Sequence, residues 1–207
     1  EKRVDLLPLA YTRPVSEFRI GILTIKEKWL KRMPKEAVFA GYITEEYLQD
    51  KYPSNIKEDQ FWINASICPN DDLINDILSL DLNESLFDEH DNIIAFRSKD
   101  FENLVNCKKL NTHVAFTHIQ NLWDIFSKNG IELEADFELI TSGRRSHTLN
   151  ASNKFMGLEN IFIEEGAQVN CAILNANAGS IYIAKDAVVM EGSMIRGPFA
   201  LGEASQT

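Results

Sequence analysis

The stretch IAKDAVVMEGSMIRGPFALGEASQ, residues 183–206, carries an aliphatic residue at every sixth position. A six-residue period fits neither a helix with 3.6 residues per turn nor a long ordinary strand. It is typical of a parallel β-helix, in which each six-residue segment forms one flat side of a coil and the aliphatic side chain points into a narrow core. The residues predicted to form this core are Ile183, Val189, Ile195 and Leu201, preceded at the same spacing by Ile163 and Val169.

Small residues and glycines occur where such a coil would turn. The fourth residue after an aliphatic position is small in four cases, whereas Phe199 does not fit. The small residues are Ala167, Ala187, Ser193 and Ser205. Val169 lies fourteen residues before Ile183, two more than a multiple of six, and we expect a small loop over 175–180 to absorb the difference. The alternative, chance alternation in a β-sandwich, is disfavoured by four successive hexads.

The first two thirds of the chain alternate between helical and strand-like patterns, as in an α/β layer. The polar stretch 141–154 is interpreted as a connection. We therefore predict an α/β domain over residues 1–150, followed over 151–207 by the start of a parallel β-helix of hexapeptide repeats, truncated at the chain end. The predicted helices cover 21–33, 44–52, 71–80 and 117–130, the last ended by Gly130, and the predicted strands cover 37–41, 61–67 and 92–98.

Charge and composition exclude several classes of function. The 207 residues carry a net charge of −10, which argues against broad nucleic-acid binding but leaves room for a small basic pocket for a phosphorylated metabolite. No signal peptide and no apolar run long enough to cross a bilayer occurs, so we expect a cytoplasmic protein without membrane contact. Three widely spaced cysteines predict free thiols. The chain lacks an initiator methionine and ends inside the repeat, so we expect it to be part of a longer protein.

Four stretches together resemble the bifunctional bacterial enzymes that make UDP-N-acetylglucosamine, in the divergent Bacteroides-type branch. The stretches are LLPLAYTRPVSEFRIGILTIKEKW (6–29), WINASICPN (62–70), GIELEADFELITSGRRSHTL (130–149) and IYIAKDAVVMEGSMIRGPFALGE (181–203). In that family the front domain is an N-acetylglucosamine-1-phosphate uridyltransferase, and the left-handed β-helix is a glucosamine-1-phosphate acetyltransferase. The resemblance implies a homotrimer formed through the β-helix, with Mg²⁺ as cofactor and a nucleoside triphosphate and a sugar 1-phosphate as substrates.

The resemblance also implies a phosphate site in the opening stretch. In ordinary sugar nucleotidyltransferases a glycine-rich loop precedes an arginine, a PLT-like turn and a proline–lysine pair, and the cations neutralise phosphate charge. Here Pro8 opens the turn, whereas Val15 replaces the lysine. Arg13 and Arg19 flank that gap and are the predicted catalytic cations, because a guanidinium fork suits phosphate. The alternative is surface ion pairing with acids such as Glu17.

The resemblance assigns the substrate-binding, metal-binding and acetyltransferase residues less completely. Pro8, Lys26 and Asn64 are predicted to bind the nucleotide or sugar, with Asn64 standing where ordinary members have a metal-binding aspartate. The metal ligands therefore stay unassigned, and the first strand with its glycine-rich loop is expected upstream of this chain. No histidine follows His147, so the acetyltransferase base, and with it the use of acetyl-CoA, is expected beyond Thr207.

Three functions are compatible with these residues. The first is formation of UDP-N-acetylglucosamine from UTP and N-acetylglucosamine 1-phosphate, joined to a β-helix acyltransferase. The second is a hexapeptide-repeat acetyltransferase whose front domain only binds a sugar nucleotide. The third is a non-catalytic β-helix assembly subunit. Nucleotide turnover separates the first from the other two, and acetyl-CoA binding separates the second from the third.

Overall fold

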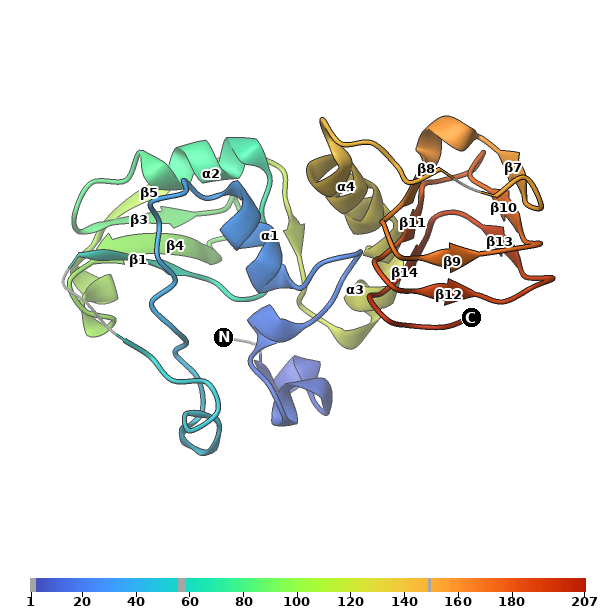
Figure 1. The fold of residues 1–207 in the computed structure, drawn as a ribbon. Helices are drawn as coiled ribbons and strands as arrows, with labels where there is room; N and C mark the ends of the chain where they lie inside the picture. The colour runs from blue at the N-terminus through green and yellow to red at the C-terminus, as the bar shows by residue number, and fades with distance from the viewer. Residues whose placement is uncertain (1–2, 56–58, 149) are drawn as a thin grey trace. The chain divides into compact units, whose positions relative to one another are not determined.

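The computed structural model describes residues 3–55, 59–148 and 150–207, which form two compact units (Figure 1). The first unit contains Glu1–Arg19 and Thr24–Ile125, and the second contains Ile20–Leu23 and Phe126–Thr207. The two compact units divide the chain after Ile125, whereas the predicted domain boundary lies at residue 150. That domain boundary stays a prediction. Leu149, inside the predicted connection, lies outside the described residues.

The first unit is built on a four-stranded mixed sheet in the order β1-β4-β3-β5. Its neighbours are antiparallel except for the parallel pair β3 and β5, and a small antiparallel pair, β2 and β6, lies outside this sheet. The strands are β1 Gln60–Ile63, β2 Ile67–Cys68, β3 Glu84–Phe87, β4 Ile93–Ser98, β5 Lys108–Asn111 and β6 Thr117–His118. The short 3-10 helices are η1 Arg3–Leu6, η2 Leu9–Tyr11, η3 Val15–Glu17, η4 Glu46–Leu48 and η5 Glu102–Asn106. The mixed α/β character predicted from the sequence is confirmed.

Two capped helices belong to this unit, α1 Ile25–Arg32 and α2 Asp71–Leu78. Thr24 forms a capping box with Glu27: its side chain accepts from the Glu27 N–H at 3.2 Å, and the Glu27 carboxylate accepts from the Thr24 N–H at 2.7 Å. Asn70 caps α2 by accepting from the Leu73 N–H at 2.9 Å. The helix predicted over 21–33 therefore starts at Ile25, directly after its capping residue and four positions later than the sequence pattern suggested.

Three sequence-based predictions of local structure are wrong. Residues 37–41 form no strand, because Val38 is 77% exposed and only an isolated bridge joins Gly41 to Ser54. The helix predicted over 44–52 is reduced to η4, where Leu48 is the single buried residue. The helix predicted over 117–130 is instead β6 followed by α3 Leu122–Ser127.

The region predicted to end at Gly130 has a different boundary. Gly130 lies in the first turn of α4 Asn129–Thr141, so it does not terminate a helix. Trp123 is 68% exposed and Phe126 is 87% exposed, so the aromatic side chains of α3 are open to solvent. Trp29 and Trp62, by contrast, are buried.

The second unit contains three parallel sheets, which the chain visits in rotation (Figure 1). The sheets have the orders β13-β10-β7, β14-β11-β8 and β12-β9. The elements are η6 Leu158–Asn160 and the strands β7 Lys154–Met156, β8 Ile161–Ile163, β9 Gln168–Val169, β10 Ile173–Asn175, β11 Ile181–Ile183, β12 Val188–Val189, β13 Met194–Arg196 and β14 Phe199–Leu201. This rotation agrees with the predicted coil, while closure into a left-handed β-helix stays a prediction.

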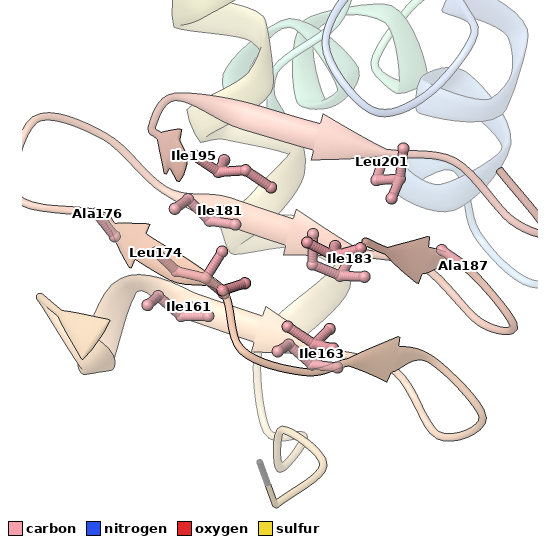
Figure 2. Packing of buried hydrophobic residues seen from close by; sticks show 12 residues of the cluster. Ile161, Ile163, Leu174, Ala176, Ile181, Ile183, Ala187, Ile195 and Leu201 are labelled. Atoms are coloured by element: carbon pink, nitrogen blue, oxygen red, sulfur yellow. The ribbon is translucent and has the colours of Figure 1, made fainter. Parts of the chain in front are cut away.

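The six aliphatic residues of the repeat share one core. All six are at most 8% exposed and belong to a single cluster of buried residues, part of which is shown in Figure 2. The register explains the irregular first coil. Leu174 pairs with Ile195, one position earlier than a strict six-residue step from Val169. The turn before β10, which contains Cys171 with φ 53°, is therefore one residue shorter than a six-residue period requires. The predicted loop before Ile181 is longer by the same one residue.

Helix α4 packs on the sheet formed by β8, β11 and β14. Leu133 of α4 and the segment Ile20–Leu23 share a buried cluster with Phe162 and Tyr182. Asp136, fully buried on α4, accepts from the N–H groups of Ile22 and Leu23, each at 2.9 Å. These bonds attach an N-terminal segment to a helix that lies more than a hundred residues further along the chain.

Candidate active site

Two prolines shape the opening stretch of the chain. Pro8 precedes η2, and its carbonyl accepts from the Tyr11 N–H at 3.1 Å. Pro14 precedes η3 in the same way, and its carbonyl accepts from the Glu17 N–H at 3.0 Å. Val15, the residue that replaces the lysine expected by resemblance, is 5% exposed. The position of that lysine is therefore a core position in this chain.

A hydrogen-bonded triangle links this stretch to α1. The Lys26 Nζ donates to the Glu17 carboxylate and, at 2.8 Å, to the Tyr42 hydroxyl, which itself donates to Glu17. The Lys26 Nζ also lies 5.5 Å from the centre of the Tyr42 ring and 5.7 Å from that of Phe39. We call Glu17, Lys26, Tyr42 and Phe39 the Glu17 cluster.

Within the Glu17 cluster, Glu17 and Lys26 each stabilise the charged form of the other. Burial raises the pKa of Glu17, but hydrogen bonds from Lys26 and Tyr42, together with the positive charges of Lys26 and Arg13, outweigh burial and leave this pKa below its ordinary value. Burial lowers the pKa of Lys26, yet its hydrogen bonds to Glu17 and Tyr42 leave that pKa above its ordinary value. At neutral pH the cluster therefore holds a carboxylate and an ammonium group.

The two predicted catalytic arginines are both exposed. Arg13 is exposed, and its charge acts on Glu17, the carboxylate that also binds Lys26. The Arg19 side chain is 60% exposed and lies 3.9 Å from the Glu27 carboxylate that caps α1. The structure thus pairs Lys26 with the Glu17 carboxylate, on which Arg13 acts through its charge, and places Arg19 beside another carboxylate. The roles of both arginines stay predictions.

Asn64 follows β1, and protein groups occupy both ends of its amide. Its Nδ2 donates to the Ile93 carbonyl at 2.9 Å, and its Oδ1 accepts from the Ser66 N–H at 3.1 Å and the Ser66 hydroxyl at 2.8 Å. The Ser66 hydroxyl lies 3.0 Å from Nε2 of His118. A sugar or base would compete with these partners for the amide, and the predicted substrate contact stays a prediction.

The comparison with protein families decides the class of this chain. A family model described as sugar nucleotidyl transferase matches residues 1–145. The chain belongs to the sugar nucleotidyl transferase family. Its members are nucleotidyltransferases whose substrates are nucleotides and sugar phosphates. No curated protein and no solved structure matches the chain significantly.

The resemblance implies Mg²⁺ as cofactor, but no ligand for it is assigned among the described residues. Both hydrogen bonds to the Asn64 Oδ1 come from Ser66, and Asp71 lies 3.5 Å from the Arg32 guanidinium. Among residues 3–55, 59–148 and 150–207, no three His, Cys, Asp or Glu side chains group together as metal ligands would. Mg²⁺ usually binds through one or two carboxylates together with substrate phosphates. Its use here stays a proposal, without an assigned ligand.

Sequence reasoning missed Tyr42 and the Ser66–His118 pair. Tyr42 lies in an irregular segment without periodicity, so nothing in the sequence placed it beside Lys26. The contact of Ser66 with Asn64 could have been predicted, because an asparagine two residues before a serine commonly accepts a hydrogen bond from the backbone N–H of that serine.

In the described part of the chain, no helix has both the length and the apolar composition needed to cross a membrane.

Proposed function

We propose that this sugar nucleotidyl transferase forms UDP-N-acetylglucosamine from UTP and N-acetylglucosamine 1-phosphate. The observation that carries the proposal is the ion pair of Lys26 with Glu17, a carboxylate that also feels the charge of Arg13, within the region matched by the family model. Lys26 and Arg13 outnumber the one carboxylate on which they act, which leaves a small basic site in a chain of net charge −10. Such a site suits a compact polyanion better than an extended nucleic acid.

The proposed reaction is an in-line displacement. An oxygen of the sugar phosphate attacks the α-phosphorus of UTP, the bond to the oxygen bridging to the β-phosphate breaks, and pyrophosphate leaves. The protein contributes mainly position and charge stabilisation in reactions of this kind. Arg13 and Arg19 would supply guanidinium groups to the phosphates and Lys26 an ammonium group. The turn at Pro8 would shape the approach of the nucleotide, and Asn64 would support the sugar or base.

The second part of the proposal concerns the parallel sheets of the second unit. We propose that they begin a left-handed β-helix that trimerises and, in a longer protein, carries an acyltransferase site using acetyl-CoA. The shared aliphatic core and the rotation between three sheets support this proposal. An acetyltransferase with a binding-only front domain is the main alternative, favoured by the buried Val15 and the occupied amide of Asn64.

Release of pyrophosphate tests the nucleotidyltransferase proposal. The full chain is mixed with UTP, N-acetylglucosamine 1-phosphate and Mg²⁺, alongside Arg13→Ala, Arg19→Ala and the control Arg196→Ala. Arg196 is exposed on β13, outside the family match, so its loss changes net charge without touching the site. Turnover that falls in the first two variants alone supports the proposal. No turnover across a panel of nucleotides and sugar phosphates would favour the acetyltransferase.

A further inference from the structure

Glu17 occupies the place where a substrate phosphate is expected. Its carboxylate receives the Lys26 ammonium and the Tyr42 hydroxyl and feels the charge of Arg13. Carboxylate and phosphate oxygens accept from the same donors, and ionised acceptors form the stronger hydrogen bonds. The Glu17 cluster therefore already contains an anion bound by the groups assigned to the nucleotide.

The ion pair is not needed to hold the elements that carry it. The capping box of Thr24 and Glu27 starts α1, and Ile25 and Trp29 fix its buried face. The turn of η3 is closed by its own backbone hydrogen bond to Pro14, and Val15 anchors it in the core. Contact between Glu17 and Lys26 is thus separable from the local fold.

The surroundings make this ion pair stronger than one in open water. The side chain of Glu17 is 19% exposed and that of Lys26 is 25% exposed, with two aromatic rings against the ammonium group. Partly buried charges are screened less by salt than exposed charges are. The remaining exposure of Glu17 also leaves its side chain a route to solvent once another anion binds.

We propose that Glu17 is an internal competitor: it holds Lys26 in the free enzyme and is displaced by the pyrophosphate portion of a nucleoside triphosphate. A polyphosphate carries enough charge to exchange with a carboxylate, whereas a small monoanion gains little from the exchange. Glu17 would thereby favour triphosphates over simple anions. The Tyr42 hydroxyl helps to hold Glu17 in the competing position. This inference rests on the proposed function of Lys26 and Arg13.

Calorimetric titration with inorganic pyrophosphate tests the inference independently of turnover. The wild-type chain is compared with Glu17→Gln, which keeps an acceptor but removes the charge, and with Tyr42→Phe, which keeps the ion pair but removes the hydroxyl. Glu84→Gln is the matched control, because Glu84 pairs with Lys108 at 2.8 Å elsewhere in the same unit. We expect Glu17→Gln to bind pyrophosphate about three- to tenfold more tightly, Tyr42→Phe to shift in the same direction by less, and Glu84→Gln to match wild type.

The possible outcomes separate the two proposals. Unchanged or weaker pyrophosphate binding in both Glu17→Gln and Tyr42→Phe overturns the competitor role, as does equal tightening in Glu84→Gln, which would report net charge alone. Absence of binding to all four proteins overturns it too. Turnover of UTP with a sugar 1-phosphate, measured on the same wild-type sample, reports separately on the proposed function. Thermal unfolding of each variant verifies that the proteins compared are folded.

Discussion

Removing the buried carboxylate of Asp136 should release the segment Ile20–Leu23 from α4. Asp136 is fully buried, and one of its oxygens accepts from the Ile22 and Leu23 N–H groups. Each buried N–H that loses its acceptor costs about 1–3 kcal/mol, so loss of both acceptor contacts in Asp136→Ala should weaken this attachment by roughly 2–6 kcal/mol. Asp136→Asn keeps a carbonyl acceptor and should lose much less.

Amide hydrogen exchange measures this attachment locally. In Asp136→Ala the amides of Ile22 and Leu23 should exchange at least about thirtyfold faster than in wild type, the factor that corresponds to about 2 kcal/mol. Glu138→Ala is the control, because Glu138 is an exposed carboxylate on the same helix. Unchanged protection of the two amides in Asp136→Ala, or equal loss of protection in Glu138→Ala, would refute the assignment of Asp136 as the anchor.

Three further predictions concern packing and charge. Gly197→Ala should destabilise the second unit by about 1–3 kcal/mol or more in urea unfolding, because a Cβ there would lie 1.9 Å from the Gly179 carbonyl oxygen. Gly130→Ala, whose Cβ meets only an ordinary contact at 3.8 Å, should be neutral or stabilising, and equal losses in both variants would contradict the packing argument. Ile183→Ala, at a fully buried core position, should cost about 2–5 kcal/mol, and a loss near zero would show that the repeat core is not packed as described. Since the pKa of Glu17 lies below its ordinary value of 4.5, its stabilising contribution should be complete above pH 4.5 and disappear as pH falls through the lower folded pKa. The stability difference between wild type and Glu17→Gln should narrow in that acidic window, and a constant difference across it would contradict the ion pair.

The repeat was predictable because one side chain per hexad meets the core. Ile183, Val189 and Leu201 are buried where their six-residue spacing predicted. The position of Leu174 was not predictable, since it depends on a turn shortened by one residue at Cys171. Spacing specifies which residues face inward, but turn lengths are set by backbone conformations that spacing does not encode.

Helix patterns succeeded where a cap and a buried face coincided. The helix α2 begins directly after its cap, Asn70, within the range predicted for a helix, and its residues Leu73, Ile74 and Ile77 are buried. The residues around Trp123 and Phe126 have helical spacing, but both side chains are exposed. Helical spacing alone therefore led to the wrong prediction of one helix over 117–130. Gly130 failed as a stop signal because glycine is also tolerated in the first turn of a helix.

The candidate site was predictable only in part. Arg13 and Glu17 are four residues apart, so their proximity follows from local structure, and the sequence already raised their pairing as an alternative. The contact of Lys26 with Tyr42 joins α1 to an irregular segment that lacks any periodic signal. Long-range contacts of irregular segments depend on how the whole chain folds. For this reason Tyr42, which is proposed to hold Glu17 in place, could be identified only from the structure.

Direct detection of the nucleotide sugar shows whether this chain forms UDP-N-acetylglucosamine. The full chain is incubated with UTP, N-acetylglucosamine 1-phosphate and Mg²⁺, and UDP-N-acetylglucosamine and pyrophosphate are quantified together by mass spectrometry and a coupled assay. We expect equimolar formation of both products, strongly reduced in Arg13→Ala and retained in Arg196→Ala. Consumption of UTP without any nucleotide sugar, or equal product from wild type and Arg13→Ala, would contradict it.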